Sequence, residues 1–245
     1  MPLHTVLKYK NETSVTNDVT EVYIWQIVEN EEYLMSLVNK DTLSELQDKN
    51  LINARRRIEW LATRALLHSV YPDAQIKYYP CGKPYLHNAF GEKCLSISHT
   101  EAWVALAISS QPIGIDIERW SDRPFHLAQR FLSHKEMLQL NNDEFPKTLA
   151  TRLWTAKEAA FKYFDQSTTR VITDITIHQS AQSQSTLLAQ GLGQDDKCLV
   201  YQIDFEHFAM SICVPTFLEQ ISPNNTSFVS SQRQLKYCDV SLKKR

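Results

Sequence analysis

Alternating and helical patterns of apolar residues predict several strands and one long helix in the first half of the chain. Residues 21–27 alternate in polarity and are rich in β-branched and aromatic side chains, which favours a strand. Apolar residues recur at helical spacing over residues 54–70, where Asn53 is a suitable cap and Pro72 ends the pattern. The other elements expected here are a helix at 31–38 and strands at 76–79, 95–98, 103–108 and 113–118. A turn cluster at 109–112 joins the last two of these strands, so we expect them to pair as neighbours.

The second half of the chain repeats this combination of helices and strands. Helices are expected at 125–140 and 149–164, and strands at 171–177, 185–188, 199–205 and 208–214. The stretches 60–68 and 154–162 also have similar sequences. This pattern predicts an α+β protein of two similar α/β subdomains, residues 1–112 and 113–219. Residues 220–245 are polar and end in basic residues, so we expect them to form a flexible tail.

Composition narrows the functional class. The 245 residues are 43% hydrophobic and 22% charged, which is typical of a soluble folded enzyme. A formal net charge of -2, with a pI near 6.4, gives no overall basic field of the kind that nucleic-acid binding uses. The five cysteines form neither a Cys-x-x-Cys pair nor a zinc motif, which indicates reduced thiols. There is no apolar run long enough for a membrane span and no pattern of a secretion signal, so we expect a cytoplasmic protein.

Two carboxylates lie on one face of the strand predicted at 113–118. Side chains alternate along a strand, so Asp116 and Glu118 face away from the three isoleucines. They lie about 6–7 Å apart along the strand, close enough to bind one hard cation whose other ligands are phosphate oxygens and water. Mg²⁺ is the obvious candidate. The alternative interpretation is a half-buried strand whose polar face is exposed to solvent.

The helix predicted at 149–164 combines an acid with two lysines. At 100° per residue, Glu158 and Lys162 share the polar side of the helix. They can form an i, i+4 ion pair, which on an exposed helix contributes only about 0.2–0.5 kcal/mol and has no function. Lys157 instead lies among the apolar positions, so its ammonium group must reach solvent or meet an anionic partner.

Other polar positions admit both a functional and a structural interpretation. The Ser-x-x-Glu spacing that ends at Glu136 is that of a capping box, which would engage this side chain in capping a helix. Ser98 and His99 can bind phosphate through a hydroxyl and an imidazole, although a single histidine is usually structural. Lys83 lies in a Gly-Lys-Pro turn and is by default a solvated turn residue, just as the arginines at the start of the long helix are by default exposed.

Five motifs occur in the order found in a known enzyme family. They are Gly82-Lys83-Pro84, Ser96-Ile97-Ser98-His99, Gly114-Ile115-Asp116-Ile117-Glu118, Phe131-Leu132-Ser133-His134-Lys135-Glu136 and Trp154-Thr155-Ala156-Lys157-Glu158-Ala159-Ala160-Phe161-Lys162. Over roughly residues 20–215 they together resemble the 4'-phosphopantetheinyl transferase superfamily. The length and the apparent duplication are similar to its Sfp-type branch, which implies two subdomains in a pseudo-twofold arrangement.

The resemblance implies transfer of the phosphopantetheine arm of coenzyme A to a serine of an acyl or peptidyl carrier protein, with release of adenosine 3',5'-bisphosphate. It further implies a magnesium-dependent monomer that binds coenzyme A in the cleft between its subdomains and needs neither nucleic acid nor membrane. The residues that match the family's site are the metal-binding acids Asp116, Glu118 and Glu136, the base Glu158, the phosphate-facing lysines Lys162 and Lys157, and the coenzyme contacts Lys83, Ser98, His99, Arg57 and Arg64.

Two other functions remain compatible with these residues. A different Mg²⁺-dependent phosphotransferase or hydrolase would act on a nucleotide without any carrier protein. A catalytically inactive module would recognise carrier proteins or nucleotides, although it would not be expected to retain Asp116, Glu118, Glu158 and Lys162.

Overall fold

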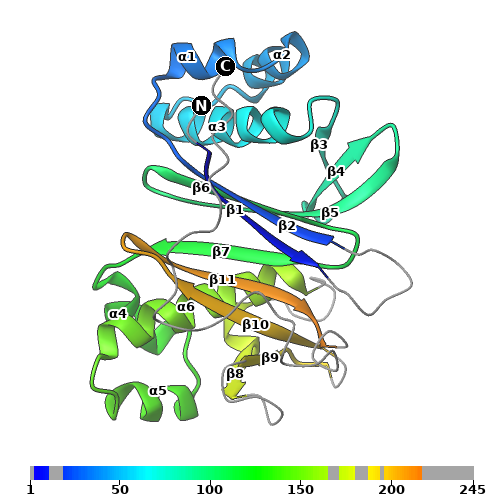
Figure 1. Ribbon diagram of the computed structural model, residues 1–245. Coiled ribbons are helices and arrows are strands. Elements are labelled where there is room, and N and C mark those ends of the chain that lie inside the picture. Colours follow the sequence, from blue (N-terminus) through cyan, green and yellow to red (C-terminus); the bar gives the residue numbers. More distant parts are fainter. Residues whose placement is uncertain (1–2, 11–18, 165–170, 180–186, 194–195, 217–245) are drawn as a thin grey trace.

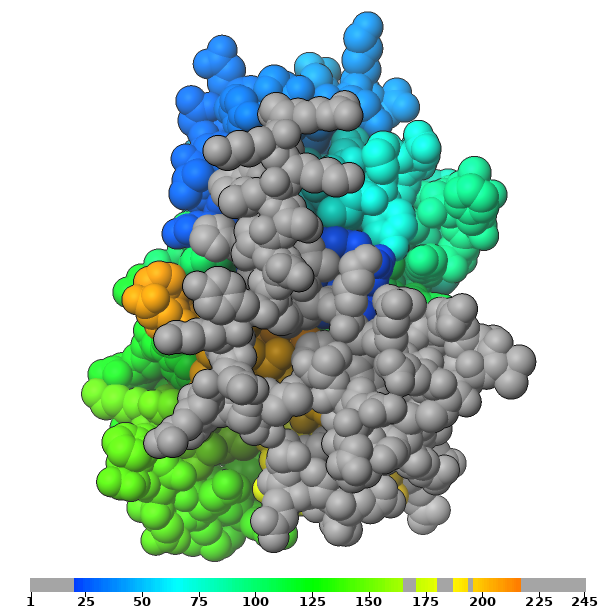
Figure 2. Space-filling view, in the orientation of Figure 1, coloured from blue at the N-terminus to red at the C-terminus, as the bar shows by residue number. Residues whose placement is uncertain are grey.

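The protein is built from four layers, in the order helices, sheet, sheet, helices (Figure 1). The computed structural model describes residues 3–10, 19–164, 171–179, 187–193 and 196–216 of the chain. Neighbouring strands in both sheets are antiparallel. Figure 2 shows the helices α1 (Glu31–Ser36) and α2 (Lys40–Lys49) at one end of the molecule and α4 (Arg123–Leu127) and α5 (His134–Asn141) at the other.

The first sheet has six strands in the order β1-β2-β6-β5-β4-β3. Helix α3 (Ala54–Val70) packs against it through residues such as Leu61 and Leu66, and α1 and α2 lie beyond α3. The Asn53 side chain caps α3, as predicted, by accepting a hydrogen bond from the backbone N–H of Arg56. The strands are β1 (Leu3–Lys10), β2 (Val19–Gln26), β3 (Gln75–Tyr78), β4 (Pro84–Asn88), β5 (Gly91–Thr100) and β6 (Trp103–Ser109).

The second sheet has five strands in the order β7-β11-β10-β9-β8. Helix α6 (Pro146–Tyr163) packs across β7 and β11, and the shorter α4 and α5 lie beside it. Among the described helices, none is both long and apolar enough to cross a membrane. The strands are β7 (Gly114–Arg119), β8 (Thr176–Gln179), β9 (Leu187–Gln190), β10 (Lys197–Asp204) and β11 (Phe208–Pro215).

A third apolar core lies between the two sheets. Ile113, Ile115 and Ile117 are buried there against residues of the first sheet such as Val22 and Ala105. The predicted alternation of β7 is therefore confirmed, because the intervening side chains face α6 instead. The polar face of β7 and its core face are fixed by the same register.

The two halves of the chain repeat one topology. When β1 is set aside, the first sheet follows the order β2-β6-β5-β4-β3 and the second the order β7-β11-β10-β9-β8, in which each strand has the same rank along the chain. A long helix, α3 or α6, follows the first strand of each set. This confirms the predicted α+β class with two similar halves in a pseudo-twofold arrangement.

One prediction about strand pairing is wrong. We expected the strands at 103–108 and 113–118 to be neighbours, but β6 lies in the first sheet and β7 in the second. The physical reason is that β6 is already flanked on both edges by β2 and β5. Strand β7 pairs instead with β11, which allows its isoleucines to fill the core between the sheets.

Several boundaries also differ from the prediction. Strands β1 and β4 and helix α2 were not expected. The helix predicted at 125–140 is interrupted, because a 3₁₀ turn at Ala128–Arg130 and the capped start of α5 separate α4 from α5. The strand predicted at 171–177 begins only at Thr176, after a 3₁₀ turn at Ile172–Asp174. The predicted tail, residues 220–245, lies outside the described residues.

Candidate active site

Helix α6 lies directly against strand β7 because the strand begins with a glycine. A Cβ atom on Gly114 would lie 2.0 Å from the backbone oxygen of Ala159 and 2.8 Å from the backbone nitrogen of Tyr163. No other residue type fits this approach without moving the helix. The contact places the polar side of α6 next to Asp116 and its neighbours on β7.

Asp116 is the centre of the polar cluster between β7 and α6. Its side chain is buried, and its Oδ1 accepts hydrogen bonds from Lys162 Nζ and Ser98 Oγ, both at 2.8 Å. Lys162 Nζ also donates to the backbone oxygen of Ile115 at 3.0 Å. The second carboxylate oxygen, Oδ2, is buried and has no partner among the described residues. Leaving a buried carboxylate oxygen unpaired is costly, so Oδ2 is the position where a bound ligand would gain most.

Two further carboxylates adjoin Asp116. The pKa of Glu118 is raised to about 7, first by burial and then by the charge of Asp116. Arg123 and Lys162 oppose this shift, whereas Glu158 adds to it. The pKa of Glu158 is also raised, mainly by burial and further by Asp116. The three acids thus repel one another, and Lys162 offsets the repulsion only in part.

The donor set fits a hard divalent cation. The described residues contain no preassembled cluster of three or more His, Cys, Asp or Glu ligands. Mg²⁺, however, is usually held by one or two carboxylates together with substrate phosphates and water. Asp116 and Glu118 supply such carboxylates from one strand face, and the unpartnered Oδ2 is available for coordination. A cation there would also relieve the repulsion that raises the pKa of Glu118 and Glu158.

Glu136 and Lys157 form a separate cluster. Both side chains are buried, and Lys157 Nζ lies 2.8 Å from Glu136 Oε2. Lys157 also donates to the backbone oxygens of Phe131 and Ile175, while Glu136 accepts from the backbone N–H of Ile177. The structure thus pairs these two residues with each other, rather than directing Glu136 to the metal ligands and Lys157 to a phosphate as expected from the sequence.

Of the expected coenzyme contacts, Ser98 and His99 point in opposite directions from β5. The hydroxyl of Ser98 is buried against Asp116, whereas half of the His99 side chain is exposed. Nδ1 of His99 lies 3.5 Å from Oε2 of Glu59, a buried acid that also accepts a hydrogen bond from Arg55. His99 therefore remains accessible to a ligand, and Ser98 does not.

Lys83 connects the first half of the chain to the end of α6. It lies on the turn between β3 and β4, where Gly82 adopts a φ of +86°. Its Nζ donates to the backbone oxygen of Tyr163 at 2.9 Å. Lys83 thus places a cation beside Tyr163, the last residue of α6.

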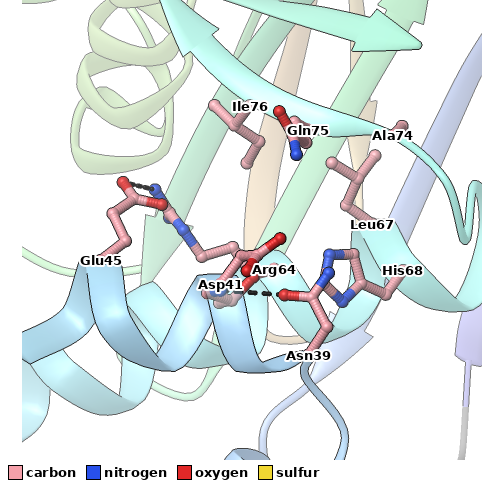
Figure 3. Close-up of a pocket in the computed structure, with 10 residues that line it drawn as sticks. Asn39, Asp41, Glu45, Arg64, Leu67, His68, Ala74, Gln75 and Ile76 are labelled. Atoms are coloured by element: carbon pink, nitrogen blue, oxygen red, sulfur yellow. Dashed lines mark hydrogen bonds and ion pairs between the residues drawn. The ribbon is translucent and has the colours of Figure 1, made fainter. Parts of the chain in front are cut away.

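The two arginines that were expected to contact coenzyme A instead bind side chains in the first half of the chain. Arg57 forms a two-pronged pair with Glu31, at 2.8 and 3.0 Å, and donates to backbone oxygens of the loop before α3. Arg64 is buried, lies 3.5 Å from the ring of Trp60 and donates to Glu45. Figure 3 shows this pair at the wall of a cavity of about 180 Å³ between α2 and α3. The residues that line the cavity all fall between 39 and 76, so none belongs to β7 or α6.

Two residues near the site were not found by reasoning from the sequence. Glu59 contacts His99 from within α3, and its signal was an acid among the buried positions of that helix. Arg123, at the start of α4, lies close enough to influence Glu118. No sequence signal marks Arg123, because its proximity depends on how α4 folds back toward β7.

Comparison with known sequences identifies proteins that this chain resembles. A family model described as the 4'-phosphopantetheinyl transferase superfamily matches residues 112–213, which include β7, α6 and most of β11. The 4'-phosphopantetheinyl transferase gsp of Aneurinibacillus migulanus is 30% identical over 121 residues, 48% of this chain and 50% of the relative. The chain spans about half the length of this curated relative.

Two further relatives match longer segments at lower identity. The 4'-phosphopantetheinyl transferase psf-1 of Bacillus pumilus is 28% identical over 172 residues, 66% of this chain and 72% of the relative. The 4'-phosphopantetheinyl transferase Sfp of Bacillus subtilis (strain 168) is 26% identical over 146 residues, 54% of this chain and 64% of the relative.

Proposed function

We propose that this chain, which belongs to the 4'-phosphopantetheinyl transferase superfamily and resembles its Sfp-type branch, transfers the 4'-phosphopantetheine arm of coenzyme A to a serine of an apo acyl or peptidyl carrier protein. The products are the holo-carrier protein and adenosine 3',5'-bisphosphate. The observation that carries the proposal is the unpartnered Oδ2 of Asp116, which lies in one cluster with Glu118, Glu158 and Lys162.

The site supplies the charge that phosphoryl transfer requires. Such transfer depends mainly on positioning and on neutralising the oxygens around the phosphorus. Asp116 and Glu118 would hold Mg²⁺, which when bound supplies positive charge to the pyrophosphate of coenzyme A. Lys162, which already donates to Asp116, adds an ammonium group at the same position. Glu136 is not included among the ligands, because its carboxylate is paired with Lys157.

Glu158 is the proposed general base. A serine hydroxyl is a weak nucleophile at neutral pH and requires a nearby proton acceptor. Glu158 accepts the serine proton as the serine oxygen forms a bond to the β-phosphorus of coenzyme A. The bond between that phosphorus and the oxygen of adenosine 3',5'-bisphosphate breaks in the same transfer, and the leaving group takes the bonding electrons. The raised pKa of Glu158 makes it a stronger base than an exposed glutamate.

The rest of the assignment concerns binding. His99 and Lys83 are proposed to hold the nucleotide part of coenzyme A, because the first is exposed and the second lies beside the end of α6. Coenzyme A would then lie between subdomains formed by residues 1–112 and 113–219. We further propose that the protein acts as a monomer in the cytoplasm.

The proposal is tested by intact-mass spectrometry of an apo acyl carrier protein incubated with this protein, coenzyme A and Mg²⁺. The expected result is a mass gain of one phosphopantetheine unit that disappears when EDTA replaces Mg²⁺. The Glu158→Gln variant should form product at least about a hundredfold more slowly, the usual range for loss of a general base. Full activity of Glu158→Gln would contradict the assigned base.

The same experiment separates the alternative functions when a panel of peptidyl and acyl carrier proteins is used. Consumption of coenzyme A or of a nucleotide without a mass gain on any carrier would indicate another Mg²⁺-dependent phosphotransferase or hydrolase. Binding of carriers without consumption of coenzyme A would indicate an inactive binding module. Either result would overturn the proposed transfer.

A further inference from the structure

Three hydroxyl groups of β5 hold the free edge of β7. Oγ of Ser96, Oγ of Ser98 and Oγ1 of Thr100 accept hydrogen bonds from the backbone N–H groups of Ile115, Ile117 and Arg119, at 2.9, 3.1 and 3.3 Å. All three hydroxyl-bearing side chains are buried. We call these three residues the hydroxyl ladder.

The ladder follows from the period of the two strands. Alternate residues of β5 point toward β7, and alternate N–H groups of β7 point away from β11, so the contacts recur every second residue on both sides. An edge strand whose N–H groups are buried must find acceptors. The first sheet supplies these acceptors through side chains, and the described strands of the two sheets do not pair with each other.

Ser98 differs from the other two members because it makes a second contact. Its Oγ is also 2.8 Å from Asp116 Oδ1. A hydroxyl has one proton, and since Ser98 Oγ accepts from the N–H of Ile117, that proton is free to be donated to the carboxylate. Lys162 donates to the same oxygen. Both donors on Oδ1 orient the carboxylate and leave Oδ2 without a partner among the described residues.

We propose that Ser98 is a positioning residue, which fixes the carboxylate of Asp116 so that Oδ2 is presented to the metal ion. The proposal rests on the proposed function and revises the role of Ser98, which the sequence resemblance assigned to coenzyme A. Ser98 is only 4% exposed and its proton is committed to Asp116, so it has little capacity for a coenzyme contact. One half of the molecule thereby orients a metal ligand that belongs to the other half.

The test is a titration of Ser98→Ala with Mn²⁺, a paramagnetic substitute for Mg²⁺, followed by the electron paramagnetic resonance signal of free Mn²⁺ in the presence of coenzyme A. Ser98→Ala is expected to raise the Kd for Mn²⁺ about tenfold or more, the effect of losing one hydrogen bond to a charged group. The KM for coenzyme A at saturating metal should change by less than about twofold. Ser96→Ala and Thr100→Val remove the other ladder hydroxyls and should leave the Kd for Mn²⁺ close to that of the unmodified protein.

The competing outcomes are distinguishable. An unchanged Kd for Mn²⁺ with a raised KM for coenzyme A would show that Ser98 contacts the coenzyme, and would overturn the proposal. Equal weakening of Mn²⁺ binding by Ser98→Ala and Ser96→Ala would also overturn it, because the effect would then belong to the ladder as a whole. Absence of Mn²⁺ binding by the unmodified protein would overturn it as well. If no carrier is modified but Ser98→Ala selectively weakens Mn²⁺ binding, the proposed function fails and the role of Ser98 stands.

Discussion

Two lysines of α6 show how the position of a residue within one helix decides what its ammonium group does. Lys157 is fully buried and is held by Glu136 and two backbone oxygens. Lys162 keeps 28% of its side chain exposed and donates to Asp116. Burying an ammonium group is unfavourable unless carboxylate and carbonyl oxygens replace the lost water. Lys157 therefore joins α6 to α5, and Lys162 stays accessible to a ligand.

The first prediction concerns the buried pair. Lys157→Met is expected to lower the free energy of unfolding by about 3–5 kcal/mol, because Glu136 is left as a buried charge without its partner. The double variant Glu136→Leu/Lys157→Met removes both charges and should recover much of the loss. Urea-induced unfolding measures both effects.

The matched control is Lys135→Met, which replaces an exposed lysine of α5 and should change the free energy of unfolding little. If Lys157→Met retained normal stability but lost transferase activity, the lysine would contact the pyrophosphate, as the family resemblance implied, and the structural role would be wrong.

The second prediction concerns the pair of Arg57 with Glu31. The hydrogen bond from Arg57 lowers the pKa of Glu31, against an opposing effect of burial. A carboxyl whose pKa is lower in the folded protein contributes stability above its unfolded pKa and loses that contribution as the pH falls through the folded pKa. Glu31→Gln should therefore lower the melting temperature slightly at pH 7 and cease to do so in acid. Thermal unfolding across pH measures this, and a difference that persists in acid would contradict it.

Reasoning from single residues predicted which side chains share a face better than it predicted which of them contact each other. Asp116 and Glu118 were placed on one strand face from alternation alone, and α6 does bring Glu158 and Lys162 against that face. The need of Lys157 for an anionic partner was also apparent. That the partner is Glu136 depends on how α5 packs on α6, and no local pattern in the sequence contains that information.

At the scale of elements, the crossing of α6 over β7 depends on one missing side chain. Gly114→Ala would place a methyl group on the backbone of Ala159, which cannot move without displacing the helix. The third prediction is that Gly114→Ala lowers the free energy of unfolding by about 3 kcal/mol or more, at or above the upper range for an overpacked core. The proposed transferase activity should fall further than the loss of stability alone explains, because Lys162 and Asp116 are moved apart.

Chemical denaturation and the carrier-protein assay measure these two effects. Gly91→Ala is the control, because Gly91 also disfavours a side chain through a φ of +114°. Apart from its chain neighbours, no described residue has an atom within 4 Å of the added carbon. Gly91→Ala should lower the free energy of unfolding by about 1–2 kcal/mol and leave the activity unchanged. If both variants lost the same free energy of unfolding, steric overlap with α6 would not be the cause of the effect of Gly114→Ala.

The elements that were not predicted from the sequence are those with weak local patterns of apolar residues. Helix α2 has only two leucines, Leu43 and Leu46, among ten residues, which is too few for a clear helical period. Strand β4 begins with Pro84 and has only one fully buried residue, Leu86. The pairing of β7 was mispredicted because a turn between two strands suggests a hairpin, whereas the choice of partner depends on which edges are already occupied.

At the scale of the whole molecule, the two halves share a second feature besides strand order. In each half, the long helix carries a buried cation that pairs with a glutamate of the helix before it: Arg64 with Glu45, and Lys157 with Glu136. The similarity between the sequences of residues 60–68 and 154–162 instead aligned Arg64 with Glu158. The contacts thus align Arg64 with Lys157, and in the second half an acid and a lysine of the long helix also lie against the first strand.

The hydroxyl ladder makes the site a property of both halves, and hydrogen exchange can detect this coupling. Strand β7 lies at the edge of its sheet, where outward-facing N–H groups normally exchange fast. The fourth prediction is that the amides of Ile115 and Ile117 exchange slowly, because Ser96 and Ser98 accept their hydrogen bonds. Ser96→Ala should accelerate exchange at Ile115 about tenfold, the effect of losing roughly one hydrogen bond.

Amide exchange followed by nuclear magnetic resonance gives the required residue-level readout. The amide of Asp116, which points toward β11 by strand alternation, serves as the internal control and should be unaffected by Ser96→Ala. Fast exchange at Ile115 and Ile117 in the unmodified protein would mean that the two halves separate readily in solution. Asp116 would then be oriented only intermittently, since one of its two hydrogen-bond donors, Ser98, comes from the other half. Slow exchange at both amides would instead mean that the two halves stay in contact in solution, so that Ser98 keeps the carboxylate of Asp116 oriented.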